Sequence, residues 1–82
     1  MPQRHNEYYR KGILSMTERY LLSMFKDEPE ILTVTEAARL LRIGKNKAYG
    51  LVNSGELSSI KVGGKILVPK MKVIDFILQK AN

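Results

Sequence analysis

The chain has 82 residues, a formal net charge of +6 and no cysteine. This length fits a single domain near the lower limit for independent folding. The absence of cysteine excludes disulfides, thiolate metal sites and cysteine nucleophiles, and the single histidine, His5, has no second histidine with which to bind a metal. No apolar run reaches the roughly 20 residues needed to span a bilayer, and the N-terminus lacks the apolar segment of a signal peptide. We therefore expect a cytoplasmic protein without a membrane partner.

The positive charge is concentrated in one part of the chain. Residues 42–72 carry seven of the fourteen lysines and arginines and one acidic residue, Glu56. Residues 15–41 carry three basic and five acidic residues. A merely soluble basic protein would not need such clustering, so the distribution favours a surface that faces a polyanion.

Residues 1–14 are expected to form a flexible basic arm, and residues 15–82 are expected to form the folded domain. Ser15 and Glu18 match a capping box, which predicts a helix at about 16–26. The residues expected to form the apolar face of this helix are Tyr20, Leu21, Met24 and Phe25. Pro29 ends the helical pattern.

Two further helices are predicted by local end signals. Thr33 and Glu36 form a second capping box ahead of a helix at 34–42. Gly44 is an acceptable N-cap for a helix at 45–53, and Gly55 stands where a helix commonly ends in a left-handed residue.

A hairpin and a last helix complete the predicted fold. Residues 58–62 and 65–68 are short β-like runs joined by Gly63-Gly64, a two-residue hairpin signal that Pro69 follows. Val73, Ile74, Phe76 and Ile77 then indicate a C-terminal helix. The predicted fold class is α+β: a small winged helix-turn-helix with a two-stranded β-hairpin wing, a C-terminal helix and an additional N-terminal helix.

On a helical wheel, the helix at 45–53 has an apolar and a polar side. Ala48, Leu51 and Val52 share one side, and the opposite side is formed by Asn46, Gly50 and Asn53, with Lys47 and Tyr49 on the flanks. If the apolar side packs inward, the other side is free to enter a major groove. There the two asparagines would read base edges, Lys47 would reach guanine or a phosphate, and Tyr49 would bind a phosphate.

The role of Gly50 remains open at this stage. Gly50 is costly inside a helix, by about 1 kcal/mol relative to alanine. A close approach to DNA and close packing against another helix explain it equally well.

In the hairpin, Lys61 and Lys65 flank Gly63 and Gly64, a composition suited to contacts with the sugar-phosphate backbone. Arg42 and Lys70 are candidates for additional phosphate contacts.

Residues 32–49, with Gly55-Glu-Leu and Ile60-Lys-Val-Gly-Gly-Lys, resemble the excisionase-type DNA-binding domain, a winged helix-turn-helix related to the MerR group. The segment 42–47 resembles excisionases of conjugative transposons most closely. The resemblance covers about residues 31–80 and implies that the second helix enters the major groove while the wing contacts the minor groove or backbone. It assigns these roles to Lys45, Asn46, Lys47 and Tyr49, and to Lys61, Gly63, Gly64 and Lys65.

The sequence also departs from this family. Members often carry arginine where Gly50 and Asn53 stand, so the resemblance implies modest sequence specificity here. The wing has lysine where arginine is common, which favours point-charge phosphate contacts.

The resemblance implies an excisionase, or recombination directionality factor, that bends double-stranded DNA for an integrase and associates with itself on DNA. It further implies a nucleoid-associated bacterial protein without cofactor, metal or small-molecule ligand. A transcriptional regulator of the same fold is the alternative, and a protein–protein adaptor that docks through the N-terminal helix is a remote one. An enzyme is not expected, because no catalytic pair of carboxylates and no phosphate-binding glycine loop is present.

Overall fold

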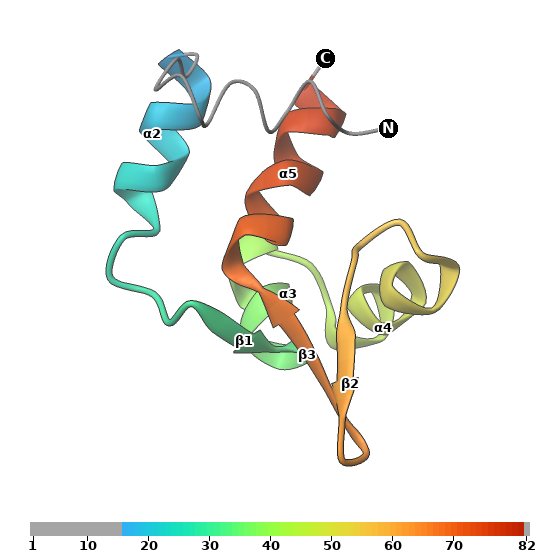
Figure 1. The fold of residues 1–82 in the computed structure, drawn as a ribbon. Helices are drawn as coiled ribbons and strands as arrows, with labels where there is room; N and C mark the ends of the chain where they lie inside the picture. Colours follow the sequence, from blue (N-terminus) through green and yellow to red (C-terminus); the bar gives the residue numbers. More distant parts are fainter. Residues whose placement is uncertain (1–15, 82) are drawn as a thin grey trace, which may run out of the picture.

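The computed structural model describes residues 16–81. The elements in this range, in chain order, are α2 (Met16–Met24), β1 (Ile31–Thr33), α3 (Val34–Leu41), α4 (Lys45–Ser54), β2 (Ile60–Val62), β3 (Lys65–Pro69) and α5 (Lys70–Ala81). Helix α5 stands in the middle, with α2 on one side of it and α4 on the other, and the β2–β3 hairpin projects from the domain as a wing (Figure 1). The arm predicted at 1–14 and the Ser15 cap lie outside the described residues.

Helix α3 begins at the predicted capping box. The Thr33 hydroxyl accepts a hydrogen bond from the Glu36 amide at 3.1 Å, and the Thr33 amide donates to the Glu36 carboxylate at 2.9 Å. These bonds satisfy backbone donors that a helix start leaves free. The helix ends one residue earlier than predicted, because Arg42 adopts a left-handed backbone with φ 60°.

Helix α4 extends one residue beyond the predicted range and is bounded by the two expected glycines. Gly44 has an extended backbone, and its carbonyl accepts from the Ala48 amide at 3.0 Å. Gly55 has φ 84°, a conformation that glycine adopts without strain. The Leu57 amide then donates to the Leu51 carbonyl at 3.1 Å, so the chain turns back and buries Leu57 completely.

The sheet has one strand more than the predicted hairpin. Its order is β1-β3-β2 with both pairs antiparallel, and Leu32 of β1 faces Val68 of β3 in the core. Strand β1 was not predicted, because its three residues form no local pattern and its pairing is non-local. Strand β2 begins at Ile60 rather than residue 58, and β3 includes Pro69.

The turn between β2 and β3 is formed by the two predicted glycines. Gly63 and Gly64 have φ of 56° and 87°. Positive φ at both central residues is the requirement of the type I′ hairpin turn, which matches the twist of the flanking strands.

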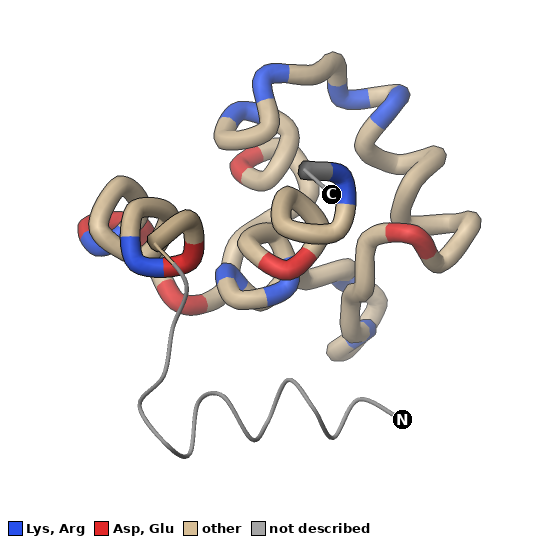
Figure 2. The backbone as a smooth tube through the Cα atoms, turned by 90° about the horizontal axis from the view of Figure 1, so that it is seen from above, with Lys and Arg blue, Asp and Glu red and all other residues tan. Residues whose placement is uncertain are grey.

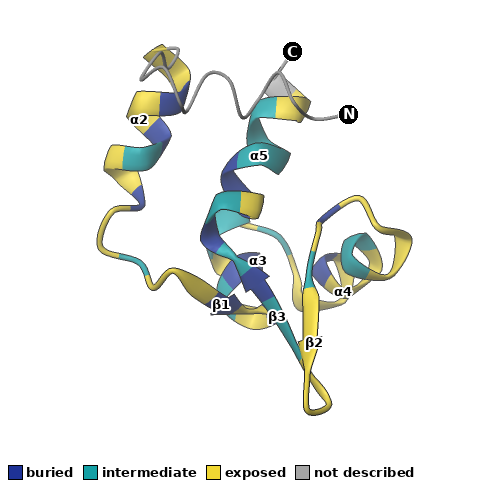
Figure 3. Ribbon diagram, in the orientation of Figure 1, coloured by how far each residue is buried: buried dark blue, intermediate teal, exposed yellow. Residues whose placement is uncertain are grey.

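The core lies where α3, the sheet and α5 meet, with α2 covering it from the side (Figure 3). Its largest fully buried side chains are Leu32, Leu57, Ile74, Val68 and Val73. Helix α2 packs on α5 and ends at Met24, before the predicted end at about residue 26. Leu21 and, directly after the helix, Phe25 are buried, whereas Tyr20 and Met24 are 68% and 54% exposed. The apolar face predicted for this helix is therefore only half correct. No helix in residues 16–81 is both long and apolar enough to cross a membrane.

Candidate nucleic-acid interface

Helix α4 presents the two sides that the helical wheel predicts. Ala48 is fully buried, and Leu51 and Val52 are half-buried where α4 packs on α3. Asn46 and Asn53, on the opposite side, are exposed. Lys45, Lys47 and Tyr49 on the flanks are exposed as well. The helix that follows the turn of the helix-turn-helix therefore offers a polar stripe to an external partner.

Gly50 lies exposed in the middle of this stripe. A Cβ atom built on Gly50 would have no atom of the molecule within 4 Å. Close packing against another helix, one of the two explanations for this glycine, is therefore excluded within residues 16–81. The other explanation, approach of an external molecule, remains.

The wing carries its two lysines on opposite faces. Lys61 pairs with Ile66, and Val62 pairs with Lys65. Paired residues share a face of a sheet and successive residues alternate, so Lys61 and Lys65 point to opposite sides of the hairpin. Both lysines and both tip glycines are exposed. The hairpin is thus charged on each side.

Val62 is a surface residue that the sequence reasoning passed over. It lies next to the tip, on the same face as Lys65, and is 56% exposed. Exposed apolar side chains are common on protein surfaces, and the only signal in the sequence was the position of Val62 beside the Gly-Gly turn.

Positive charge accumulates around the start of α4 without compensation. Arg42, Lys45 and Lys47 follow one another along the α3–α4 turn and the first turn of α4 (Figure 2). Within residues 16–81, none of these three residues forms an ion pair, and neither do Lys61 and Lys65.

Within residues 16–81, no acidic side chain forms an ion pair with this cluster of positive charge. Helix α4 has no acidic residue in its first turn, although a helix N-terminus favours acidic side chains. Glu56, the only acidic residue between 42 and 72, lies 3.4 Å from the Lys80 ammonium. The potential near α4 is therefore positive, as a surface for phosphates requires.

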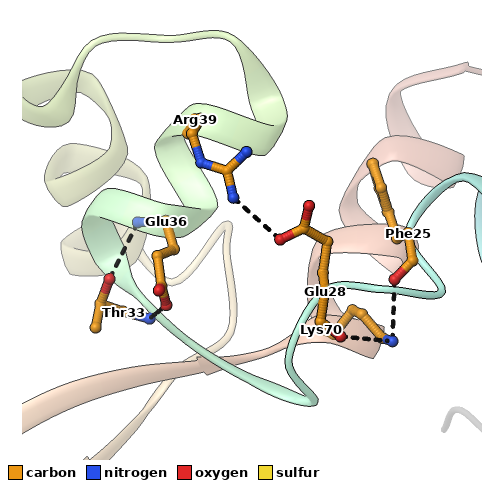
Figure 4. A network of polar contacts seen from close by, with 6 residues as sticks. All are labelled: Phe25, Glu28, Thr33, Glu36, Arg39 and Lys70. Atoms are coloured by element: carbon orange, nitrogen blue, oxygen red, sulfur yellow. Dashed lines mark hydrogen bonds and ion pairs between the residues drawn. The ribbon is translucent and has the colours of Figure 1, made fainter.

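Lys70 does not belong to this surface, which corrects the sequence-based expectation. Its side chain is only 8% exposed, and its ammonium group donates to the Phe25 carbonyl at 3.1 Å and the Glu28 carbonyl at 3.2 Å (Figure 4). Glu30 lies 3.6 Å from the same group. The ammonium of Lys70 is thus engaged in holding the segment between α2 and β1, and it is not available to a phosphate.

Comparison with known proteins agrees with this architecture. A family model described as a helix-turn-helix domain matches residues 31–81. The chain is 45% identical over 49 residues to a Streptomyces ambofaciens protein named "Excisionase". The aligned residues cover 60% of this chain and 79% of that protein. It is 41% identical over 46 residues to a Saccharopolyspora erythraea protein named "Probable excisionase", covering 56% of this chain and 47% of that protein.

No solved structure matches the chain at a comparable level of significance. The match to the helix-turn-helix family spans α3, α4, the sheet and α5, and it leaves α2 outside. From the fold, the charged surface and these relatives together, we conclude that the chain belongs to the helix-turn-helix family and carries an excisionase-type DNA-binding domain.

Proposed function

We propose that the protein is an excisionase that binds and bends the DNA at the end of a mobile element and promotes excision by an integrase. The observation that carries the proposal is the surface of α4, the preceding turn and the wing, which combines exposed amides with five cations that form no ion pair within residues 16–81. The names of the two relatives support the same reading. The strand chemistry belongs to the integrase, so this cytoplasmic chain acts on the nucleoid without catalysing a reaction.

In this proposal α4 enters the major groove. Asn46 and Asn53 contact base edges, whereas Lys45, Lys47 and Tyr49 contact the phosphates beside them. The wing contacts the adjacent backbone or minor groove, and its lysines on opposite faces reach the two walls of a groove. Arg42 adds a phosphate contact at the turn.

Few strong base contacts imply that specificity arises from several copies and from DNA that bends easily. A contact between neighbouring copies, or between this protein and the integrase, therefore belongs to the proposal. The outer side of α2 is the candidate for it, because Met16, Tyr20 and Met24 are exposed there on the side of α5 away from α4 (Figure 1). Three side chains form too small a patch for a stable dimer, so the contact would operate between molecules already concentrated on DNA.

The proposal is tested by reconstituted excision, with candidate integrases from the same genome and DNA carrying the ends of their elements. We expect excision to depend on this protein, several successive shifted bands in gel electrophoresis, and a measurable bend. A variant with Lys47→Ala and Lys61→Ala should lose all three, whereas Lys26→Ala, an exposed lysine following α2, should retain them. A single complex on straight DNA, with no effect on excision, would instead identify a transcriptional regulator.

A further inference from the structure

The glycine at position 50 is explained by nothing in the described part of the chain. It does not need the positive φ that only Gly55, Gly63 and Gly64 adopt among the described glycines, and no atom lies close enough to exclude a side chain. Alanine at an exposed position inside a helix is more stable than glycine. With packing inside residues 16–81 excluded, the explanation that remains of the two is a molecule that approaches α4 from outside.

The groups on either side of Gly50 define the chemistry of that molecule. Asn46 and Asn53 are exposed on the same side of α4, seven positions apart. With a rise of about 1.5 Å per residue, they are separated by about 10 Å along the helix, the length of roughly three base pairs. Along this side of α4, the side-chain amide of Asn46 is followed by Gly50, where the missing side chain leaves a gap, and then by the amide of Asn53.

Each part of this stripe matches an A·T base pair. An asparagine amide pairs bidentately with the N6 and N7 atoms of adenine. The thymine methyl group projects into the major groove and seeks an apolar neighbour, and the bare Cα of Gly50 leaves room for it. No arginine, lysine or carboxylate lies on this side of α4 between Asn46 and Asn53, and the lysines that could bind guanine, Lys45 and Lys47, stand on its flanks, where the proposed function gives them phosphate contacts.

We propose that α4 reads A·T base pairs, with Asn46 and Asn53 each pairing with adenine and the gap at Gly50 receiving a thymine methyl. This inference rests on the proposed entry of α4 into the major groove. It adds the identity of the bases and gives Gly50 a positive role in recognising them.

The test begins with selection of binding sites from a random pool of duplexes, followed by replacement of single thymines with deoxyuridine, which lacks the methyl group. We expect an A·T core in the selected sites. Removal of one methyl should weaken the wild-type protein about fourfold, the equivalent of one buried methylene. The variant Gly50→Ala should bind the intact selected site no more tightly than the wild-type protein binds the site without that methyl. The affinity of this variant should not change when the methyl is removed.

Thermal unfolding separates this effect from damage to the fold. Gly50→Ala should raise the Tm, because alanine stabilises the helix and meets no atom. The matched control is Ser23→Ala on α2, which also improves an exposed helical position and should leave DNA affinity unchanged.

Selection of a G·C core, binding without any base preference, or full affinity of Gly50→Ala would overturn the inference while DNA binding itself stands. Indifference of the wild-type protein to every thymine methyl in the core would overturn it as well. Failure to bind any duplex would overturn the proposed function.

Discussion

Several residues of the candidate interface are poor choices for stability alone. Gly50 weakens an exposed helix, Arg42 occupies a left-handed conformation that suits glycine, and Lys45 and Lys47 place cations at a helix N-terminus. Local rules of this kind are commonly broken at functional sites. The concentration of such exceptions around α4 is consistent with selection for binding.

Asn46 and Lys65 should differ in what they contribute to binding. Asn46→Ala should weaken binding to the specific site by roughly 1–3 kcal/mol and leave random DNA unaffected, because a base contact carries sequence information. Lys65→Ala should weaken both to a similar extent, because a phosphate contact carries none. Titration of each variant with the selected site and with a random duplex measures the two effects.

Matched controls for this pair are available on other elements. Gln79→Ala removes an exposed amide from α5, and Lys26→Ala removes an exposed lysine near α2; neither should change affinity. Equal losses on both duplexes for Asn46→Ala would show that α4 does not read bases through this residue.

Sequence reasoning at this scale succeeded where a residue's environment is set by its own helix. The helical wheel separated Ala48 from Asn46 and Asn53 correctly, because both sides follow from one repeat. It failed for Lys70, because the partners of that ammonium group are backbone carbonyls of Phe25 and Glu28, distant in sequence. A lysine in a basic segment gives no local sign that it will be buried.

At the scale of elements, boundaries set by contacts within a few residues were predicted, and features set by contacts distant in sequence were not. Thr33, Gly44 and Gly55 marked helix ends through bonds within a few residues, and these ends were predicted to within one position. Strand β1 was missed because it is defined only by its pairing with β3. The inner side of α2 was misjudged because the position of α5, rather than the hydrophobicity of Tyr20 and Met24, decides which side is buried.

Lys70 should be a determinant of stability that connects α5 to the end of α2. Lys70→Met keeps most of the buried stem but removes the ammonium donor to the Glu28 carbonyl, and it leaves the Phe25 carbonyl with the Glu28 amide as its remaining donor. Loss of a partner for buried polar groups costs about 1–3 kcal/mol, so the free energy of unfolding in urea should fall by this amount. DNA affinity, measured well below the Tm, should be retained.

The control for this change is Lys72→Met, which removes an exposed lysine from the same helix and should leave stability within about 0.5 kcal/mol. A loss of DNA affinity by Lys70→Met at unchanged stability would return this lysine to the binding surface.

At the scale of the whole molecule, charge is unevenly distributed. Five cations that form no ion pair within residues 16–81 gather on α4, the preceding turn and the wing, whereas the segment from α2 to α3 holds most of the acidic residues and pairs Glu28 with Arg39 at 3.0 Å. A molecule with this asymmetry orients itself in the field of DNA before contact.

The salt dependence of binding should report the number of cations engaged. If Arg42, Lys45, Lys47, Lys61 and Lys65 each neutralise one phosphate, log K against log salt should have a slope of about −4.5 on duplex DNA. Each lysine replaced by alanine in this set should reduce the slope by about 1. Affinity that hardly varies between low and moderate salt would contradict an electrostatic interface.

The pairing of Ile31 with Pro69 closes the chain into a loop that contains α3, α4 and the wing. Helix α4, with ten residues and an internal glycine, is too short to be stable in isolation, so it persists only while this closure holds. Closure of a long loop is entropically unfavourable until β1, β3 and the core assemble together. The surface for DNA therefore forms in one cooperative step, and a protease that removes β1 would abolish it without cutting a single residue that touches the duplex.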